Sequence, residues 1–281
     1  MVRTPRSRRP LMPPAPAGTL GAPGGPIVID ELKICGHAAA LVSAKRRPDD
    51  VLRVFLRRDR GAEFGALLAH CAQARRPYRF VEDDELEKVS GTRHHQGICV
   101  VMRSPQVWDH DDVLATAHEA QHARRPQRWL FLDRVGNPHN FGAIARTAAH
   151  FGVTALLTPD WPDAAGYSTA AFRTAEGGLE FVPVARLADP LRTLRALRDQ
   201  AGVDLLATAA DGQYDVWQDD PPRAAVWMLG SEREGLAPEL RHEATATVAI
   251  GGTGAVESLN VASAAAVVLG ASWRAHGDPL S

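Results

Sequence analysis

Glycines near the end of the chain run directly into polar side chains, in the stretch GGTGAVESLN at residues 251–260. Glycine-rich turns often cradle phosphate groups, but a P-loop ends in Gly-Lys-Ser/Thr, and these glycines lead instead to Ala255, Val256 and Glu257. A dinucleotide-binding turn opens a βαβ unit, and too little chain follows residue 260 to build one. The stretch therefore indicates another ligand, or an ordinary turn between a strand and a helix.

A second polar segment, LDRVGNPHNFGAIARTA at residues 132–148, follows an apolar strand. We expect a helix to begin near Asn140, because asparagine is a favourable N-cap residue. Arg146 lies about a turn and a half further along that helix, so its side chain could reach the loop at the helix start. A capped helix with a solvated arginine is the alternative interpretation.

A third segment, MLGSEREGL at residues 228–236, leads from an apolar strand to Gly230, where the missing side chain lets a ligand approach the backbone. Glu232 follows, either as a functional carboxylate or as a helix-capping group. The last helix of the chain is expected to begin around Ser258, with that serine or Glu257 as its cap.

Apolar strands that alternate with helices must position these three segments. Their alternation over residues 128–281 predicts an α/β domain with a mostly parallel sheet covered by helices. Ligands of such sheets lie beyond the carboxyl ends of the strands, which is where the three segments fall. The expected strands are WLFLD, TALLTP, FVPV, VDLLATA, AVWMLG and TATVAI.

The rest of the chain divides into three parts. Residues 1–26 are rich in Pro, Gly and Ala and carry four arginines, so we expect a disordered basic tail. Residues 27–104 alternate between helical patterns and the strands VLRVFLRR, YRFV and GICVVM, which predicts a smaller α/β domain. Residues 105–127 are expected to be a linker, although DDVLATAHEAQHA within them could form a helix.

Taken together and in this order, the three segments resemble the motifs of the SpoU class of SPOUT RNA 2′-O-methyltransferases. The matching patterns are N-x-G-x-x-x-R-T-A at residues 140–148, L-G-S-E-x-x-G-L at residues 229–236 and V-E-S-L-N-V-A at residues 256–262. GHAAALVSA and GTRHHQGICVVM, at residues 36–44 and 91–102, resemble parts of the substrate-binding domain that these enzymes often carry, which is similar to a ribosomal-protein RNA-binding fold.

This resemblance implies a trefoil knot whose loops hold S-adenosylmethionine, mainly through backbone groups. It also implies a homodimer formed through the last helix and the helix of the first motif. The residues expected around the reacting ribose are Asn140, Arg146, Glu232, Ser258 and Asn260. The residues expected to bind or shape the cofactor site are Gly230, Ile250, Gly251, Gly252, Gly254 and Leu259.

Charge divides unevenly along the chain, whose formal net charge is −1. Residues 1–105 hold 18 Lys and Arg and 11 Asp and Glu, a net charge of +7, and the remainder holds 14 and 22, a net charge of −8. A basic front half is typical of a protein that binds a polyanion, here tRNA or rRNA, although solvated surfaces of opposite sign would give the same count. The candidate RNA contacts are Lys45, Arg46, Arg47 and Arg93.

Several classes of protein are disfavoured by composition. No apolar run approaches the roughly 20 residues that span a bilayer, and the start is basic instead of apolar, so we expect a cytoplasmic protein. The three cysteines are far apart, and the adjacent His94 and His95 diverge, so no metal site is expected. An RNA-binding ribosome-assembly factor with a residual methyltransferase fold remains the alternative to an enzyme.

Overall fold

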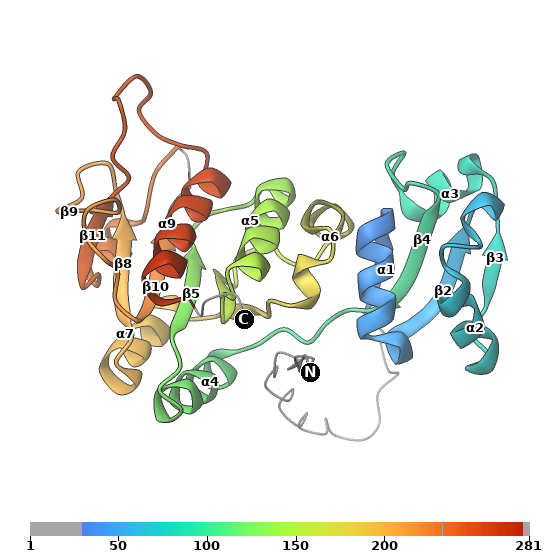
Figure 1. Ribbon diagram of the computed structural model, residues 1–281, viewed down its shortest axis with the longest axis horizontal. Coiled ribbons are helices and arrows are strands. Elements are labelled where there is room, and N and C mark those ends of the chain that lie inside the picture. Colours follow the sequence, from blue (N-terminus) through green and yellow to red (C-terminus); the bar gives the residue numbers. More distant parts are fainter. Residues whose placement is uncertain (1–29, 232, 278–281) are drawn as a thin grey trace, which may run out of the picture.

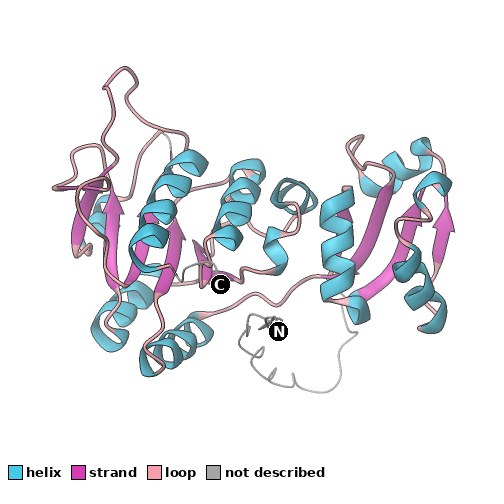
Figure 2. Ribbon diagram, in the orientation of Figure 1, coloured by secondary structure: helices cyan, strands magenta, loops and turns pink. Residues whose placement is uncertain are grey.

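The computed structural model describes residues 30–231 and 233–277, which form two α/β units (Figures 1 and 2). The tail predicted at residues 1–26 lies outside the described residues. The first unit contains a four-stranded sheet in the order β1-β4-β2-β3. Its elements are β1 (Glu31–Cys35), α1 (His37–Arg46), β2 (Val51–Leu56), α2 (Gly65–Gln73), β3 (Tyr78–Phe80), α3 (Asp83–Ser90) and β4 (Ile98–Arg103), with short 3₁₀ turns η1 (Pro48–Asp50) and η2 (Arg58–Arg60).

Strand β4 lies inside this first sheet and pairs antiparallel with both β1 and β2, whereas β3 runs parallel to β2. Successive residues point to opposite faces of a sheet. Ile34 and Val100 accordingly join the core formed with α1 and α2, while Cys35 and Cys99 pack with Leu86 of α3. The predicted small α/β domain is therefore confirmed, although β1 was not among the expected strands.

The second unit contains a seven-stranded sheet in the order β7-β6-β5-β10-β8-β11-β9, and every strand pair in it is parallel. The predicted parallel sheet is therefore confirmed. Its strands are β5 (Gln127–Leu132), β6 (Ala155–Pro159), β7 (Val184–Leu187), β8 (Asp204–Thr208), β9 (Tyr214–Asp215), β10 (Ala224–Leu229) and β11 (Ala246–Ala249). Its helices are α4 (His110–His122), α5 (Pro138–His150), α6 (Thr169–Ala175), α7 (Pro190–Ala201), α8 (Pro238–His242) and α9 (Val261–His276), and η3 (Gly178–Glu180) is a 3₁₀ turn.

Helices cover both faces of this sheet, as its continuous burial requires. All six residues of β5 are buried. Leu130 and Leu132 pack in the core that contains residues of α5, α6 and α9, and Trp129 and Phe131 pack in a separate core with residues of α4, α7 and α8. The helix α4 thus packs on the second unit, which explains why part of the expected linker is helical.

The carboxyl ends of β5, β10 and β11 lie at one edge of the sheet, where the three sequence motifs begin. A backbone hydrogen bond of 2.8 Å from Asp133 to Leu229 joins the loops that leave β5 and β10. This edge therefore gathers residues that are far apart in the sequence. Within the described residues, no helix is long and apolar enough to cross a bilayer.

The two units contact each other through α1 on one side and α6 with η3 on the other. Arg47 donates two hydrogen bonds, of 2.7 and 2.9 Å, to the carboxylate of Glu180, whose side chain is only 2% exposed. Burial alone would lower the pKa of the Arg47 guanidinium, but the hydrogen bonds and charges of Glu180 and Asp50 together raise it. The guanidinium of Arg46 lies 4.4 Å from the ring centroid of Phe181. A buried ion pair and a cation–π contact therefore join the two units.

Candidate active site

The loops that follow β10 and β11 line a cavity of about 610 Å³, which we call the loop cavity. This volume lies within the range of about 300–1,000 Å³ that small-molecule sites occupy. Ser258 lines the cavity, as does Thr208 at the end of β8. All six residues that were expected at the cofactor site line it as well, namely Gly230, Ile250, Gly251, Gly252, Gly254 and Leu259.

Gly230 is required by the way its loop folds back on itself. A Cβ atom at this position would lie only 2.0–2.1 Å from backbone atoms of Gly235 and Leu236. The loop is closed by a hydrogen bond of 2.9 Å from the Gly235 amide to the carbonyl of Ser231. Any side chain at residue 230 would push the loop open, so glycine here shapes one wall of the cavity.

The glycine-rich loop after β11 is held by Trp217, which the sequence did not indicate. Its indole Nε1 donates a hydrogen bond of 2.9 Å to the carbonyl of Gly251. Its backbone amide donates to Asp215 Oδ1 at 2.9 Å, and a Cβ at residue 251 would lie 2.6 Å from Asp215 Oδ2. The segment after β9 thus anchors the start of the glycine-rich loop.

Two motif asparagines meet next to the cavity, which is lined by Leu259 and Val261 on either side of Asn260. The side-chain amide of Asn260 donates a hydrogen bond of 3.3 Å to Oδ1 of Asn140, which lies in the first turn of α5. Asn260 also caps α9, because its Oδ1 accepts the backbone N–H of Ala262 at 2.9 Å. The fold therefore joins the first and third motifs directly, 120 residues apart in sequence.

Both predicted helix caps are wrong. The cap of α5 is Asn137, whose Oδ1 accepts the amide of His139 at 2.8 Å, and Pro138 occupies the first helical position. Asn140 therefore does not cap the helix and lies within it. The cap of α9 is Asn260 instead of Ser258 or Glu257, so Ser258 remains in the loop that lines the cavity.

Arg146 is placed apart from the other motif residues. Its guanidinium forms an ion pair of 3.0 Å with Glu176, and both side chains are more than 45% exposed. Together with Phe151 and with Ala266 of α9, it lines a separate hollow of about 630 Å³ on the outer surface of α5 and α9. Glu232, the remaining residue expected at the ribose, lies outside the described residues.

The expected RNA contacts occupy two different places. Lys45 is exposed at the end of α1, while Arg46 and Arg47 take part in the contact between the two units described above. Arg93 is far more exposed, at 84% of its side chain, and is held by one ion pair of 2.9 Å with Glu87. Of these four residues, Lys45 and Arg93 therefore lie outside the contact between the units.

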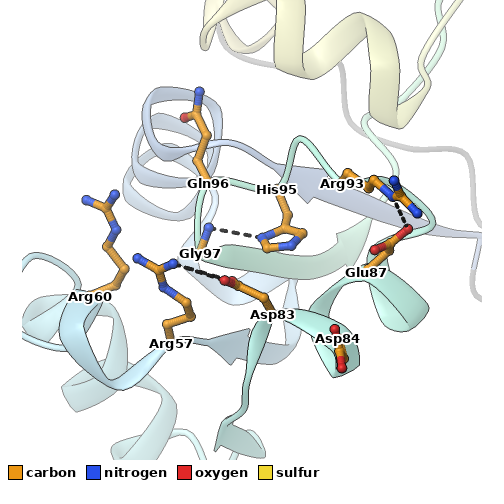
Figure 3. A pocket seen from close by; sticks show the side chains of 9 residues that line it. All are labelled: Arg57, Arg60, Asp83, Asp84, Glu87, Arg93, His95, Gln96 and Gly97. Atoms are coloured by element: carbon orange, nitrogen blue, oxygen red, sulfur yellow. Dashed lines mark hydrogen bonds and ion pairs between the residues drawn. The ribbon is translucent and has the colours of Figure 1, made fainter.

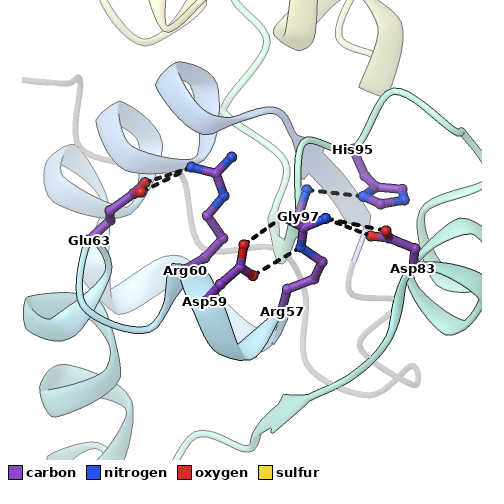
Figure 4. A network of polar contacts seen from close by, with 7 residues as sticks. All are labelled: Arg57, Asp59, Arg60, Glu63, Asp83, His95 and Gly97. Carbon is purple, nitrogen blue, oxygen red and sulfur yellow. Dashed lines mark hydrogen bonds and ion pairs between the residues drawn. The ribbon is translucent and has the colours of Figure 1, made fainter.

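Arg93 lines a polar pocket of about 410 Å³ at the end of the first sheet (Figure 3), which we call the N-terminal pocket. Arg57 lies there between Asp59 and Asp83, and Arg60 pairs with Glu63 (Figure 4). A Cβ at Gly97 would lie 3.1–3.3 Å from both guanidinium-bearing side chains, so glycine lets them approach the backbone.

No group of three potential metal ligands is found among the described residues. His95 is buried, and its Nδ1 accepts the amide of Gly97 at 3.1 Å. This contact requires an unprotonated Nδ1, so His95 has a structural role in the loop before β4.

Two protein-family models match the chain. The model of the SpoU rRNA methylase family matches residues 127–270, and a model described as the substrate-binding domain of RNA 2′-O ribose methyltransferases matches residues 34–108. Among solved structures, an AdoMet-bound rRNA methyltransferase from Sinorhizobium meliloti has a TM-score of 0.70 at 21% identity and covers 87% of each chain. AviRb, a SpoU methyltransferase from Streptomyces viridochromogenes, has a TM-score of 0.69 at 23% identity and covers 87% of this chain and 89% of its own; both show the same fold.

Two curated relatives are each 32% identical and align with 87% of this chain. One is YfiF of Escherichia coli O157:H7, named an uncharacterized tRNA/rRNA methyltransferase, of which 68% is covered. The other is RlmB of Nitrosomonas europaea, a 23S rRNA (guanosine-2′-O-)-methyltransferase, of which 92% is covered. The chain therefore belongs to the SpoU rRNA methylase family, as the motifs indicated, and is an RNA 2′-O-methyltransferase that depends on S-adenosylmethionine.

Proposed function

We propose that this enzyme methylates a guanosine ribose of ribosomal RNA, at its 2′-hydroxyl. The observation that carries the proposal is the contact between Asn140 and Asn260 next to the loop cavity, since it joins two motifs beside a ligand-sized space. The choice of RNA rests on relatives: the RlmB proteins of Nitrosomonas europaea and Neisseria meningitidis, at 32% and 29% identity, are named 23S rRNA (guanosine-2′-O-)-methyltransferases.

S-adenosylmethionine fits the loop cavity because Gly230, Gly251, Gly252 and Gly254 present backbone N–H and C=O groups without side chains to block them. When bound, the cofactor supplies an electrophilic methyl group on a sulfonium. The cavity is built at the carboxyl edge of a parallel sheet, where ligands of such sheets bind. We assign Gly230, Ile250, Gly251, Gly252, Gly254 and Leu259 to holding the cofactor or shaping its site.

The protein must align the ribose oxygen and help remove its proton, which makes positioning the main demand. Asn260 is well suited to this task because its cap to Ala262 and its contact with Asn140 fix its amide. Ser258 lies on the same loop, and its hydroxyl can accept or donate a hydrogen bond to the ribose. We propose that Asn140, Ser258 and Asn260 orient the 2′-hydroxyl, together with Glu232.

Arg146 needs a different explanation, because it does not line the loop cavity. A guanidinium offers N–H donors and a positive charge, so it can hold a phosphate and stabilise a developing alkoxide. We propose that the chain forms a homodimer through α5 and α9, which would enclose the hollow that Arg146 shares with Ala266. Arg146 would then act at the interface between the two copies.

The test is transfer of labelled methyl groups from S-adenosylmethionine to total rRNA and to total tRNA in separate reactions. The expected result is label in rRNA alone, at a nucleotide whose 3′ linkage resists alkaline cleavage, since a 2′-O-methyl group blocks attack by that oxygen. Asn260→Ala serves as the control for background transfer. Label in tRNA alone, or label at a linkage that alkali still cleaves, would contradict the proposal.

A further inference from the structure

A second cavity of about 690 Å³, which we call the side cavity, adjoins the loop cavity. Ser231 and Val261 line both cavities, so the two cavities share part of one wall. Asn140 also lines the side cavity. A ribose that contacts the two motif asparagines would therefore lie near both cavities. The second space is where the rest of the nucleotide must go.

Trp161 lines the side cavity, and 42% of its surface is exposed. Trp129 and Trp227 are buried in the core, and Trp217, although 53% exposed, is held by its indole N–H at the carbonyl of Gly251. Leaving a large apolar ring in water has a cost, which a ligand that stacks on the ring would remove. RNA-modifying enzymes commonly stack an unpaired base on an aromatic side chain in this way.

The backbone that carries Trp161 is fixed on both sides. Its carbonyl accepts a hydrogen bond of 2.9 Å from Arg186 of β7 and another of 3.1 Å from the amide of Ala164. The same turn is tied to the first motif, because the amide of Ala165 donates to the carbonyl of Val135 at 3.0 Å. A Cβ at Gly136 would lie 2.7 Å from the carbonyl oxygen of Asp163, so the two loops touch. The indole is therefore presented from a rigid loop.

Two arginines of the side cavity differ in how they are engaged. The guanidinium of Arg134 is held within the protein, since it contacts Asp133, Glu234 and the carbonyl of Gly235. Arg233 is exposed and has no ion-pair or hydrogen-bond partner within the described part of the chain. An exposed, unengaged guanidinium suits a phosphate oxygen, which it can contact with two donors.

We propose that the side cavity holds the target nucleotide, with Trp161 stacked on its base and Arg233 on an adjacent phosphate. This inference rests on the proposed function, because it assumes that the 2′-hydroxyl is oriented by Asn140 and Asn260. Trp161 lies outside the three sequence motifs, and Arg233 occupies a variable position of the second motif. A nucleotide turned out of its RNA helix is the ligand that combines a flat apolar base with a phosphate.

The test compares Trp161→Ala with Trp161→Phe in steady-state methyl transfer to total rRNA. Loss of stacking should lower kcat/KM for RNA about ten- to a hundred-fold in Trp161→Ala, while Trp161→Phe keeps a ring and stays within about three-fold of the wild type. Affinity for S-adenosylmethionine, measured by calorimetry, should be equal in all three proteins. Arg233→Gln should weaken RNA binding and reduce its dependence on salt. A kcat/KM for Trp161→Ala within three-fold of the wild type would overturn the inference.

A titration of tryptophan emission with the same rRNA separates this inference from the proposed function. Stacking should quench Trp161, so the wild type should lose more emission than Trp161→Phe does. If the wild type transfers no methyl group, the proposed function fails, and this titration still decides the inference. Equal quenching in both proteins would show that no base stacks on Trp161.

Discussion

Asn260 combines a structural and a chemical role in one side chain. Its Oδ1 caps α9, and its Nδ2 donates to Asn140 next to the loop cavity. The two roles use different atoms of the amide, which means that suitable substitutions can separate them. Capping requires only a small oxygen acceptor, whereas the contact with Asn140 requires an N–H donor on a longer side chain.

We predict that Asn260→Ser retains stability but loses activity. Serine is about as good an N-cap as asparagine, so the melting temperature should stay within a few degrees, while methyl transfer falls at least ten-fold. Asn260→Ala should lose the cap as well, at a cost of about 1 kcal/mol of unfolding free energy. Thermal unfolding and transfer assays on both variants check this. Normal methyl transfer by Asn260→Ser would show that the amide of Asn260 takes no part in the reaction.

At the scale of secondary-structure elements, part of the fold could be predicted from the sequence. The parallel strands were predictable because their apolar runs alternate with helices, and the sheet edge followed from that arrangement. The cap of α5 was predicted wrongly as Asn140, but Asn137 was predictable, because Pro138 favours the first helical position. Trp161, Trp217 and Glu180 were not, since their roles depend on contacts between loops far apart in sequence.

The ion pair between α1 and η3 illustrates such a contact. Arg47 looked like an RNA-binding residue because it stands in a run of three basic residues, Lys45–Arg47. The fold instead brings it against Glu180, 133 positions away, where a carboxylate that is 2% exposed needs a cation. Composition cannot distinguish these two uses of an arginine.

We predict that Arg47→Met destabilises the enzyme by ~3 kcal/mol, because it leaves the carboxylate of Glu180 buried without its partner. The double variant Arg47→Met with Glu180→Gln should recover much of that loss, since the unpaired charge is then absent. Denaturant unfolding of the two single variants and the double variant measures the coupling. Additive effects of the two substitutions would show that the pair does not hold the units together.

At the scale of the whole molecule, loops that line the loop cavity and the N-terminal pocket lie on one side of the protein. The loops after β10 and β11 and the loop before β4 lie on the same side of the view in Figure 1, with α4 on the opposite side. The contact of Arg47 with Glu180 fixes this arrangement. An RNA held at the N-terminal pocket can therefore extend to the loop cavity without a change in how the units are placed.

We predict that Arg93→Gln weakens RNA binding and lowers the slope of log K against log salt by about 1, the change expected from one lost phosphate contact. Arg125→Gln is the matched control, because Arg125 is also an exposed arginine with one ion pair of 2.8 Å, to Glu119 of α4. Salt titrations of RNA affinity for both variants test this. Equal slopes for the two variants would place the RNA elsewhere on the first unit.

The proposed homodimer gives the last prediction. A bulky charge at Ala266, in the hollow that Arg146 lines on α5 and α9, should separate two copies that pack there. We expect Ala266→Arg to be monomeric by light scattering, to fold normally and to lose methyl transfer, because Arg146 would no longer lie at an interface. Ala115→Arg is the control, since Ala115 is exposed on α4, which packs on the opposite face of the sheet. A monomeric wild type, or an active monomer of Ala266→Arg, would mean that Arg146 acts within one chain and that Glu176 must release it for catalysis.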